Sequence, residues 1–395
     1  MNRENCEIAG NVESAGEESV KRTSVRAEKR ASIKAEKKTS VRAVRLAAVL
    51  SAVLAAACLL GGCQTAELED REFPMLGAVE KHEDTGEISL SFVYQDLEKV
   101  SSEMTSISGP DHFAATSGDF YKAWHNYEDG QNKMVDYNHV KVLLLNEAFL
   151  RDEGQLAELL AFLDEEEAFP RNTYVCVAEY TGPLLECGEE LSDDLGSYLE
   201  QTLENNESVS AKVLPTLGSL FDEQKNRSET LFLPYFVVEA DMPVLDGYYC
   251  IRRGEPAGRV DSDTAYLSFL SCEKLKMFVL EEGQGNFVQL QQFKSFYQLK
   301  DEGTVRVRVS CEGEMLYGEP LENSVISKYV TDYFNRLAAE NLSEGIDVSN
   351  SFKKLGGYNR DWYESWKKRA NEEPSAVYEE DLNIVYDVQV VMTTQ

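Results

Sequence analysis

The sequence feature that most constrains this chain is an uncharged stretch near its N-terminus, residues 46–62, which ends directly before Cys63. Arg42 and Arg45 lie just ahead of it. As a helix rising about 1.5 Å per residue, the stretch would reach about 25 Å, which is shorter than a hydrocarbon core of about 30 Å. A basic flank, a short apolar run and small residues at the exit are typical of a secretory signal segment rather than of a membrane span. We therefore expect residues 1–62 to be a signal segment with an extended basic leader.

The end of this stretch predicts a lipid anchor. Leu60, Gly61 and Gly62 stand directly before Cys63, and an aliphatic residue, two small residues and a cysteine resemble a bacterial lipobox. The small residues let a peptidase approach the backbone, and the thiol is the side chain that can form a thioether to diacylglycerol. An uncleaved anchor with an incidental cysteine is the alternative, and Cys58 is a weaker rival site. We expect lipidation at Cys63, since two or three acyl chains hold a protein firmly on a membrane.

The leader ahead of the apolar stretch contains an imperfect repeat over residues 24–30, 32–38 and 40–43. Residues 1–45 carry 11 basic and 7 acidic side chains. One interpretation is a regulatory or nucleic-acid-binding tail on the cytoplasmic side. The others are a long n-region that stays inside by its positive charge and is lost on cleavage, or a start codon assigned too early.

The part of the chain beyond the leader is strongly acidic. The residues from 46 onward carry 28 basic and 63 acidic groups, a net charge of −35 within a whole-chain charge of −31. Phosphate backbones repel such a body, so we expect no nucleic-acid partner. Anionic lipid headgroups repel it too, so surface charge alone would not hold it on a membrane. With 43% hydrophobic residues, it is apolar enough to fold.

The sequence lacks the common catalytic and metal-binding motifs, which points away from an enzyme. The four histidines are scattered, and the sequence contains no HExxH, GxSxG or Walker motif. Gly283 and Gly285 form a lone GxG, which is typical of a turn. Asp261 and Asp263 lack the glycine of a calcium loop, so we expect Asp261 to be a helix N-cap. The sequence predicts no catalytic residue, no metal site and no cofactor.

The cysteines beyond Cys63 are odd in number, which excludes complete disulfide pairing. They are Cys176, Cys187, Cys250, Cys272 and Cys311. Cys176 and Cys250 stand in apolar, strand-like runs and are predicted to be buried as small hydrophobic side chains. We expect mostly free thiols.

Hydrophobic periodicity predicts strands and helices that mix along the exported part without strict alternation. The expected strands are 75–79 and 88–94 as a hairpin, 140–145, 174–179, 230–238, 247–252 and 256–260 as a second hairpin, several within 275–317, and 382–390. The expected helices are 119–127, 155–163, 192–203, 213–221, one after Asp261, and 323–342. Residues 98–118 are predicted to be loop, and Pro234 predicts an edge strand or a bulge.

These elements predict an α+β fold of mixed sheets with flanking helices, in about three subdomains behind the signal peptide. A polar break at residues 204–207 suggests where the exported part divides. We place one domain at 63–205 and a second at 206–395, with a further division near 320 as an option.

Four groups of residues then occur in a recognisable order along the exported part. They are Asp70-Arg71-Glu72 with residues 76–80; His139 with Glu147-Ala148; Leu233-Pro234 with residues 245–251 and 257–261; and Asp347, Gly356-Gly357, Trp362 and Trp366 before the last strand. Together they resemble the Ger(x)C family, the lipoprotein C subunit of bacterial spore germinant receptors, from Cys63 almost to Gln395. Glu80 stands where the family usually has Asp, the tryptophans are closer together and the glycines are displaced, so the chain is a divergent relative.

The resemblance implies a non-enzymatic function. It implies a three-domain α+β fold, export, a diacylglycerol anchor on Cys63, and a place on the outer face of the spore inner membrane. It also implies two polytopic membrane subunits as partners, one with an additional soluble domain and one similar to an amino-acid transporter. On this basis we expect a subunit needed for assembly and function of a nutrient germinant receptor in spore germination. The resemblance carries over no ligand site.

Trp362, Tyr363 and Trp366 are a candidate partner surface, because the 362/366 spacing places both tryptophans on one helix face. Core packing is the alternative that we favour, since large aromatic side chains mostly bury their area.

A second functional hypothesis is a solute-binding lipoprotein that delivers a small molecule to a membrane transporter. Such proteins usually have two βαβ lobes of parallel sheet, and the strand-rich second half does not show that pattern. A secreted hydrolase is the third hypothesis, and it lacks a nucleophile–base pair in the sequence.

Overall fold

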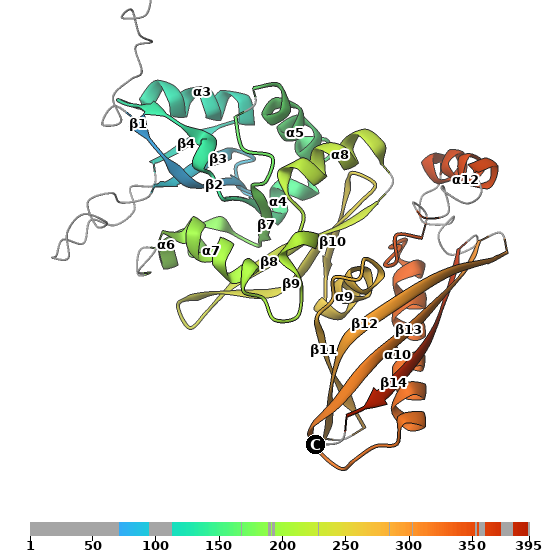
Figure 1. Ribbon diagram of the computed structural model, residues 1–395. Coiled ribbons are helices and arrows are strands. Elements are labelled where there is room, and N and C mark those ends of the chain that lie inside the picture. Colours follow the sequence, from blue (N-terminus) through green and yellow to red (C-terminus); the bar gives the residue numbers. More distant parts are fainter. Residues whose placement is uncertain are drawn as a thin grey trace, which may run out of the picture. The chain divides into compact units, whose positions relative to one another are not determined.

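The computed structural model describes residues 71–94, 113–166, 168–188, 191, 194–227, 229–283, 285–301, 303–351, 354, 360–372 and 382–393 (Figure 1). All of them belong to the second of two compact units of the chain, Met1–Leu68 and Glu69–Gln395. The described part contains an eight-stranded and a four-stranded sheet with helices packed against them. A short parallel pair is formed by β1 (Arg71–Glu72) and β5 (Met134–Val135). The predicted α+β class is confirmed.

The larger sheet has the strand order β10-β9-β8-β7-β6-β2-β3-β4. Its strands are β2 (Pro74–Lys81), β3 (Ile88–Tyr94), β4 (Phe113–Ser117), β6 (Val142–Asn146), β7 (Tyr174–Ala178), β8 (Thr230–Glu239), β9 (Met242–Arg252) and β10 (Glu255–Val260). β2 with β3 and β9 with β10 form the two predicted hairpins. β2, β6, β7 and β8 are parallel to one another, so the centre of the sheet is parallel and its flanks are antiparallel.

Helices lie on both faces of this sheet because its central strands are apolar on both sides. On one face are α3 (Phe120–Gly130), α4 (Glu147–Arg151), α5 (Gln155–Glu165) and α8 (Leu217–Asn226), and on the other α6 (Thr181–Gly188) and α7 (Leu195–Glu204). Leu143 and Leu145 point to the first face and Val142 and Leu144 to the second, and all four are buried. Two 3₁₀ turns, η2 (Tyr137–His139) and η3 (Ala211–Val213), complete this region.

Two local predictions need correction. β8 lies between β7 and β9, so the prediction that Pro234 marks an edge strand is wrong. Its pairing with β9 shifts register between Pro234 and Phe236, which confirms the alternative of a bulge and accommodates the missing N–H. Residues 113–117 are not loop, because they pair with β3 as strand β4. After Phe113 this short strand contains only small residues without an alternating hydrophobic pattern, so its formation depends on hydrogen bonds to the backbone of β3.

The predicted boundary at residue 205 lies between β7 and β8, which are hydrogen-bonded neighbours in the larger sheet. The strands on either side of it thus belong to one sheet, and the division at 205 stays a prediction. The optional division near 320 lies just before α10 (Asn323–Ser343).

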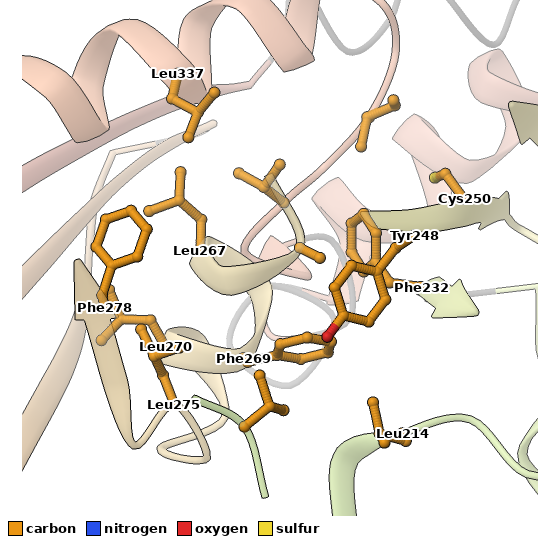
Figure 2. Close-up of a cluster of buried hydrophobic side chains, with 14 of the residues drawn as sticks. Leu214, Phe232, Tyr248, Cys250, Leu267, Phe269, Leu270, Leu275, Phe278 and Leu337 are labelled. Carbon is orange, nitrogen blue, oxygen red and sulfur yellow. The ribbon is translucent and has the colours of Figure 1, made fainter. Parts of the chain in front are cut away.

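Helix α9 (Ser262–Ser271) joins the hydrophobic cores of both sheets. Its N-cap is Asp261, as predicted, whose carboxylate accepts the N–H of Thr264 at 2.8 Å. Figure 2 shows Phe269 next to Tyr248, with the two ring centroids 5.4 Å apart and edge-on. Leu267 on the same helix belongs to the cluster that contains Phe278 of the smaller sheet.

The smaller sheet has the order β11-β12-β13-β14. Its strands are β11 (Met277–Glu282), β12 (Asn286–Asp301), β13 (Thr304–Tyr317) and β14 (Asn383–Met392). The first three are antiparallel and β14 is parallel to β13. Val305, Val307 and Val309 are buried and alternate with outward-facing residues, which confirms the predicted strand. The buried face packs against α10.

Four polar side chains of α10 hydrogen-bond the backbone of β14 along its free edge. The side chain of Asn323 accepts the N–H of Met392 at 2.9 Å, and that of Ser327 accepts the N–H of Val390 at 2.9 Å. In the same way Thr331 accepts the N–H of Val388 at 3.0 Å and Asn335 that of Tyr386 at 2.7 Å. Four helical residues rise about 6.0 Å and two strand residues about 6.6 Å, so the antiparallel helix and strand stay in step. We call this set of contacts the α10 ladder.

Candidate functional site

The predicted lipidation site lies outside the described residues. This applies to Cys63 and to the lipobox residues Leu60, Gly61 and Gly62. Among the helices that the structure describes, none combines the length and hydropathy needed to cross a bilayer. Lipidation at Cys63 stays a prediction.

The five cysteines of the described part are free thiols, four of them buried and Cys272 exposed. Burial raises the pKa of the Cys250 thiol to about 12, so the nucleophilic thiolate is scarce. Cys176 and Cys250 are completely buried in strands β7 and β9, which confirms their predicted packing role.

The aromatic residues of α12 (Arg360–Glu372) fall in different surroundings. Trp366 is 0% exposed and belongs to the core, so its ring is not on the surface. Tyr363 is half-buried against the same core, and burial raises its pKa. The side chain of Trp362 lies outside the described residues. The core interpretation therefore holds for Trp366.

Polar side chains gather where the parallel strands β2, β6 and β7 end, because the carboxyl ends of parallel strands meet at one edge of a sheet. Glu80, at the end of β2, caps helix α6, although the two are 101 residues apart in the sequence. Its Oε2 accepts the N–H of Thr181 at 2.9 Å, the N–H of Gly182 at 3.3 Å and the hydroxyl of Thr181. A carboxylate is favourable there because the helix N-terminus carries free N–H groups and a partial positive charge.

Asn146 fastens the next strand to the same edge. Its Oδ1 accepts the N–H of Lys81 at 2.9 Å and that of Phe149 at 3.0 Å, and its Nδ2 donates to the carbonyl of Lys81 at 3.0 Å. The side chain is fully buried, so its polar atoms need these partners. Asn146 thus caps α4 and fixes the end of β2.

Glu147 is the centre of a charged group beside Asn146. Its Oε1 accepts the hydroxyl of Tyr235 at 2.6 Å, and its Oε2 lies 2.7 Å from Nη2 of Arg151. Nη1 of Arg151 is 3.3 Å from Glu83, and the guanidinium of Arg259 lies 4.3 Å above the Tyr235 ring. Burial, followed by the bond to Glu147, raises the pKa of Tyr235. Tyr235 is 88 residues from Glu147, which is why the sequence did not reveal the group.

A hollow of about 620 Å³ opens next to this group, between α4, α5 and the β9–β10 hairpin. Glu147, Arg151, Arg227, Tyr249 and Glu255 are among its lining residues. Arg227 pairs with Glu255 at 3.5 Å, as Arg151 does with Glu147. Burial raises the pKa of Tyr249 to about 12. Two ion pairs, Arg151 with Glu147 and Arg227 with Glu255, therefore lie in the lining of the hollow.

The structure brings together one hydroxyl and one imidazole that the sequence search did not connect. Nε2 of His82 lies 2.5 Å from Oγ of Ser89 across the β2–β3 hairpin. Among the contacts of the described residues, no carboxylate reaches the other ring nitrogen, and the hollow is elsewhere. A triad needs that third group and an oxyanion site. The described residues also contain no group of three potential metal ligands.

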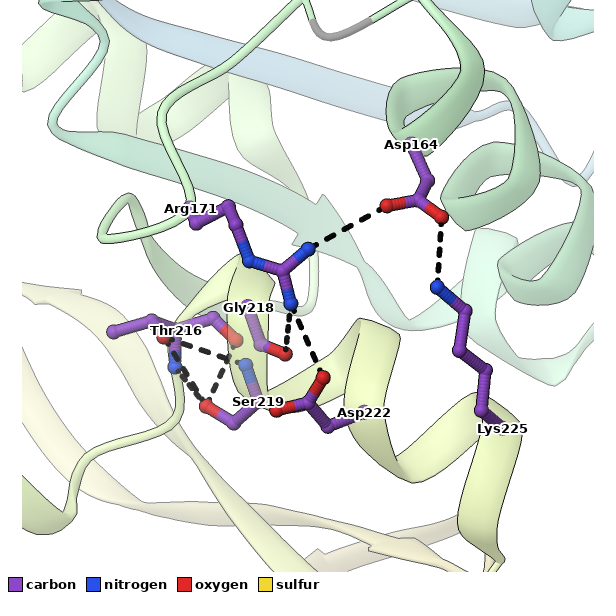
Figure 3. A network of polar contacts seen from close by, with 7 residues as sticks. All are labelled: Asp164, Arg171, Thr216, Gly218, Ser219, Asp222 and Lys225. Atoms are coloured by element: carbon purple, nitrogen blue, oxygen red, sulfur yellow. Dashed lines mark hydrogen bonds and ion pairs between the residues drawn. The ribbon is translucent and has the colours of Figure 1, made fainter.

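A further polar network joins α5 and α8, partly through Arg171 in the segment between α5 and β7 (Figure 3). Arg171 lies 3.5 Å from Asp164 and 3.1 Å from Asp222, and Lys225 lies 2.9 Å from Asp164. All of these side chains are more than a third exposed, so each pair contributes at most about 1 kcal/mol. The network positions the helices and forms no ligand site.

Comparison with known proteins gives one family. A family model described as the spore germination protein N-terminal domain matches residues 64–238. The search of curated proteins returned no match. Among solved structures, one titled "Crystal Structure of the GerBC protein" has a TM-score of 0.48 and 10% identity, and the alignment covers 80% of this chain and 97% of that one.

Proposed function

Since this chain belongs to the Ger(x)C family of spore germination proteins, we propose that it is a non-enzymatic, lipid-anchored subunit of a spore nutrient germinant receptor. In this proposal diacylglycerol on Cys63 holds the protein on the outer face of the spore inner membrane. Its partners are the two polytopic subunits of the receptor, and it is needed for the assembly and activity of that receptor.

The observation that carries the proposal is where the family match begins. It starts at residue 64, directly after Cys63, and runs through the strands of the larger sheet as far as β8. A mature chain that begins at Cys63 would contain the whole matched domain and none of the leader. The paired charges at the carboxyl edge of the sheet also support a scaffold, since they hold strands and helices in place.

The partner contacts are proposed to include the exposed part of α12. With Trp366 in the core, Trp362 and Tyr363 remain the candidates on this helix, and Trp366 fixes its position. Substitution of Tyr363 by Ala is expected to weaken capture of the polytopic subunits, measured per amount of folded protein because the ring also packs against the core.

Lipidation is tested by replacing Cys63 with Ala in the full chain, with Cys58→Ala as the matched control. We expect Cys63→Ala to abolish labelling by radioactive palmitate and to move the protein out of the membrane fraction or leave it unprocessed. Cys58→Ala should label and fractionate as the unchanged chain does. Labelling that persists in Cys63→Ala and disappears in Cys58→Ala would move the anchor to Cys58.

The receptor function is tested in spores that lack this chain. We expect loss of germination with one set of nutrients, normal vegetative growth, and normal germination with agents that bypass nutrient receptors. A complete nutrient response in these spores would contradict the proposal.

One observation favours the second candidate, a solute-binding lipoprotein. The hollow beside Glu147 has a volume in the range of small-molecule sites. Binding of amino acids or sugars there would raise the melting temperature of the protein, and Arg151→Ala would remove the rise. No shift with any solute would leave the receptor-subunit proposal as the one supported.

A further inference from the structure

Large apolar side chains on the described surface gather on one face of the smaller sheet. Val279, Phe287, Phe296 and Val391 are exposed and alternate with the buried residues that face α10, and exposed Tyr317 stands opposite Phe287 at a register shift of β12 and β13. We call the face that they share the outer face. Phe296 is 61% exposed and Tyr317 is 71% exposed. The open face of such a sheet is normally polar, and apolar groups with polar neighbours mark interaction sites.

The charges on the outer face are separated into two halves along the strands. The cross-strand pairs show the order: Arg308 stands beside Phe296, and Ser310 beside Lys294 and Gln389. On one side of this middle row lie the basic Arg306 and Arg308, with Asp387 as an acidic neighbour. On the other side lie the acidic Glu281, Glu312 and Glu314 with Phe287 and Tyr317.

The two halves act as separate charged regions. Arg308 and Glu314 are six residues apart on β13, a distance of about 20 Å at about 3.3 Å per residue. This is more than twice the screening length of about 8 Å at physiological ionic strength. A partner would fit this face if its own charges ran in the reverse order along the strands, with acidic groups over Arg306 and Arg308 and basic groups over Glu312 and Glu314.

We propose that this partner is a second copy of the same chain, docked face to face through the outer face. A two-fold axis in the interface, crossing the strands near Ser310, reverses the strand direction of one copy relative to the other. It places Arg306 and Arg308 of each copy over Glu314 and Glu312 of the other. A two-fold interface must be self-complementary, and a face with one basic and one acidic half meets that condition.

The size of the outer face fits such an interface. Four strands about 4.8 Å apart and the ten residues of β14 give roughly 600 Å² per copy. Two copies bury about 1,200 Å², which lies at the lower end of specific protein interfaces. The net charge of −35 on the residues from 46 onward opposes association, but screening confines that repulsion to short range, where the opposite charges of the two faces meet.

The proposal is tested by cross-linking in cells that produce the full chain. Ser310 is exposed and lies at the proposed axis, so its counterpart in the second copy is the nearest residue. The parent variant is Cys272→Ser, which removes the exposed thiol of the described part. Ser310→Cys in this parent should give a product of twice the mass with a bismaleimide about 10 Å long, the spacing of packed sheets. Tyr121→Cys, which is also exposed but lies on α3 against the larger sheet, is the matched control and should give none above the parent.

Charge reversal then separates specific docking from chance collision. Arg306→Glu with Arg308→Glu, and Glu312→Arg with Glu314→Arg, should each reduce the Ser310→Cys product at least tenfold. The two reversed chains, produced together with different tags, should restore a product that carries both tags, which also shows that both fold. Absence of the product, equal products from Tyr121→Cys, a product that contains another protein, or failure of the mixed pair would each overturn the proposal.

Discussion

The α10 ladder makes a quantitative prediction about the edge of the smaller sheet. Asn335 forms two hydrogen bonds with the backbone of Tyr386, accepting its N–H at 2.7 Å and donating to its carbonyl at 3.0 Å. Substitution by Ala removes both, and each bond contributes about 1 kcal/mol net. Asn335 is half-buried, so water replaces the lost partners only in part. We expect local opening of β14 to become easier by about 2 kcal/mol, which is about 30-fold in its equilibrium constant.

Hydrogen exchange of the peptide that contains β14 measures this opening directly. The amide of Tyr386 should exchange about 30-fold faster in Asn335→Ala than in the unchanged chain. Asn335→Asp keeps an acceptor for the N–H and loses the donor, so its effect should be intermediate. Asp332→Ala, on the exposed side of α10, is the control and should leave β14 unchanged. Equal exchange of β14 in Asn335→Ala and Asp332→Ala would refute the reasoning.

Three further predictions concern packing and charge. Gly196→Ala should lower the free energy of unfolding by about 1–3 kcal/mol, because the added Cβ would meet the backbone of Met75. Gly182→Ala is the control and should lower it far less, because its Cβ meets open space. Equal melting temperatures of the two variants would contradict this. Burial lowers the pKa of Lys354 from 10.5 to about 8, so the unfolded chain binds more protons and stability should rise from pH 8 to 10. That rise should be smaller in Lys354→Met, and an unchanged slope would mean that another group is responsible. Trp366→Ala should cost about 3–5 kcal/mol in denaturant unfolding, since the ring is fully buried. An unchanged midpoint in that variant would place the ring outside the core.

The α10 ladder also explains why no further strand can pair with the free edge of β14. An edge strand presents unpaired N–H and C=O groups to any passing strand. Here the groups of alternate residues from Tyr386 to Met392 are taken by side chains of the same chain. Association through the smaller sheet is therefore expected on its outer face and not by strand addition at β14.

Much of the local structure could be predicted from the sequence, because it depends on neighbours along the chain. The two-residue period of Val305, Val307 and Val309 predicted a strand with one buried face. Asp261 was predicted to be a helix N-cap, and its carboxylate accepts the N–H of Thr264 three residues later. Strand β4 was missed because its residues carry no hydrophobic pattern of their own. The position of Pro234 was misjudged because the order of strands in a sheet depends on pairing between distant segments.

The sequence by itself determined the division into a basic leader, an uncharged stretch and an acidic remainder, and it determined the family that the chain resembles. The uncharged stretch before Cys63, the basic leader and the acidic remainder follow from composition along the chain, which does not depend on the fold. Only the tertiary structure showed that Glu80 caps α6, that Glu147 meets Tyr235, and that the charges of the outer face separate into halves. These depend on strand register and on contacts across 88 residues or more, where a shift of one residue turns every side chain to the opposite face.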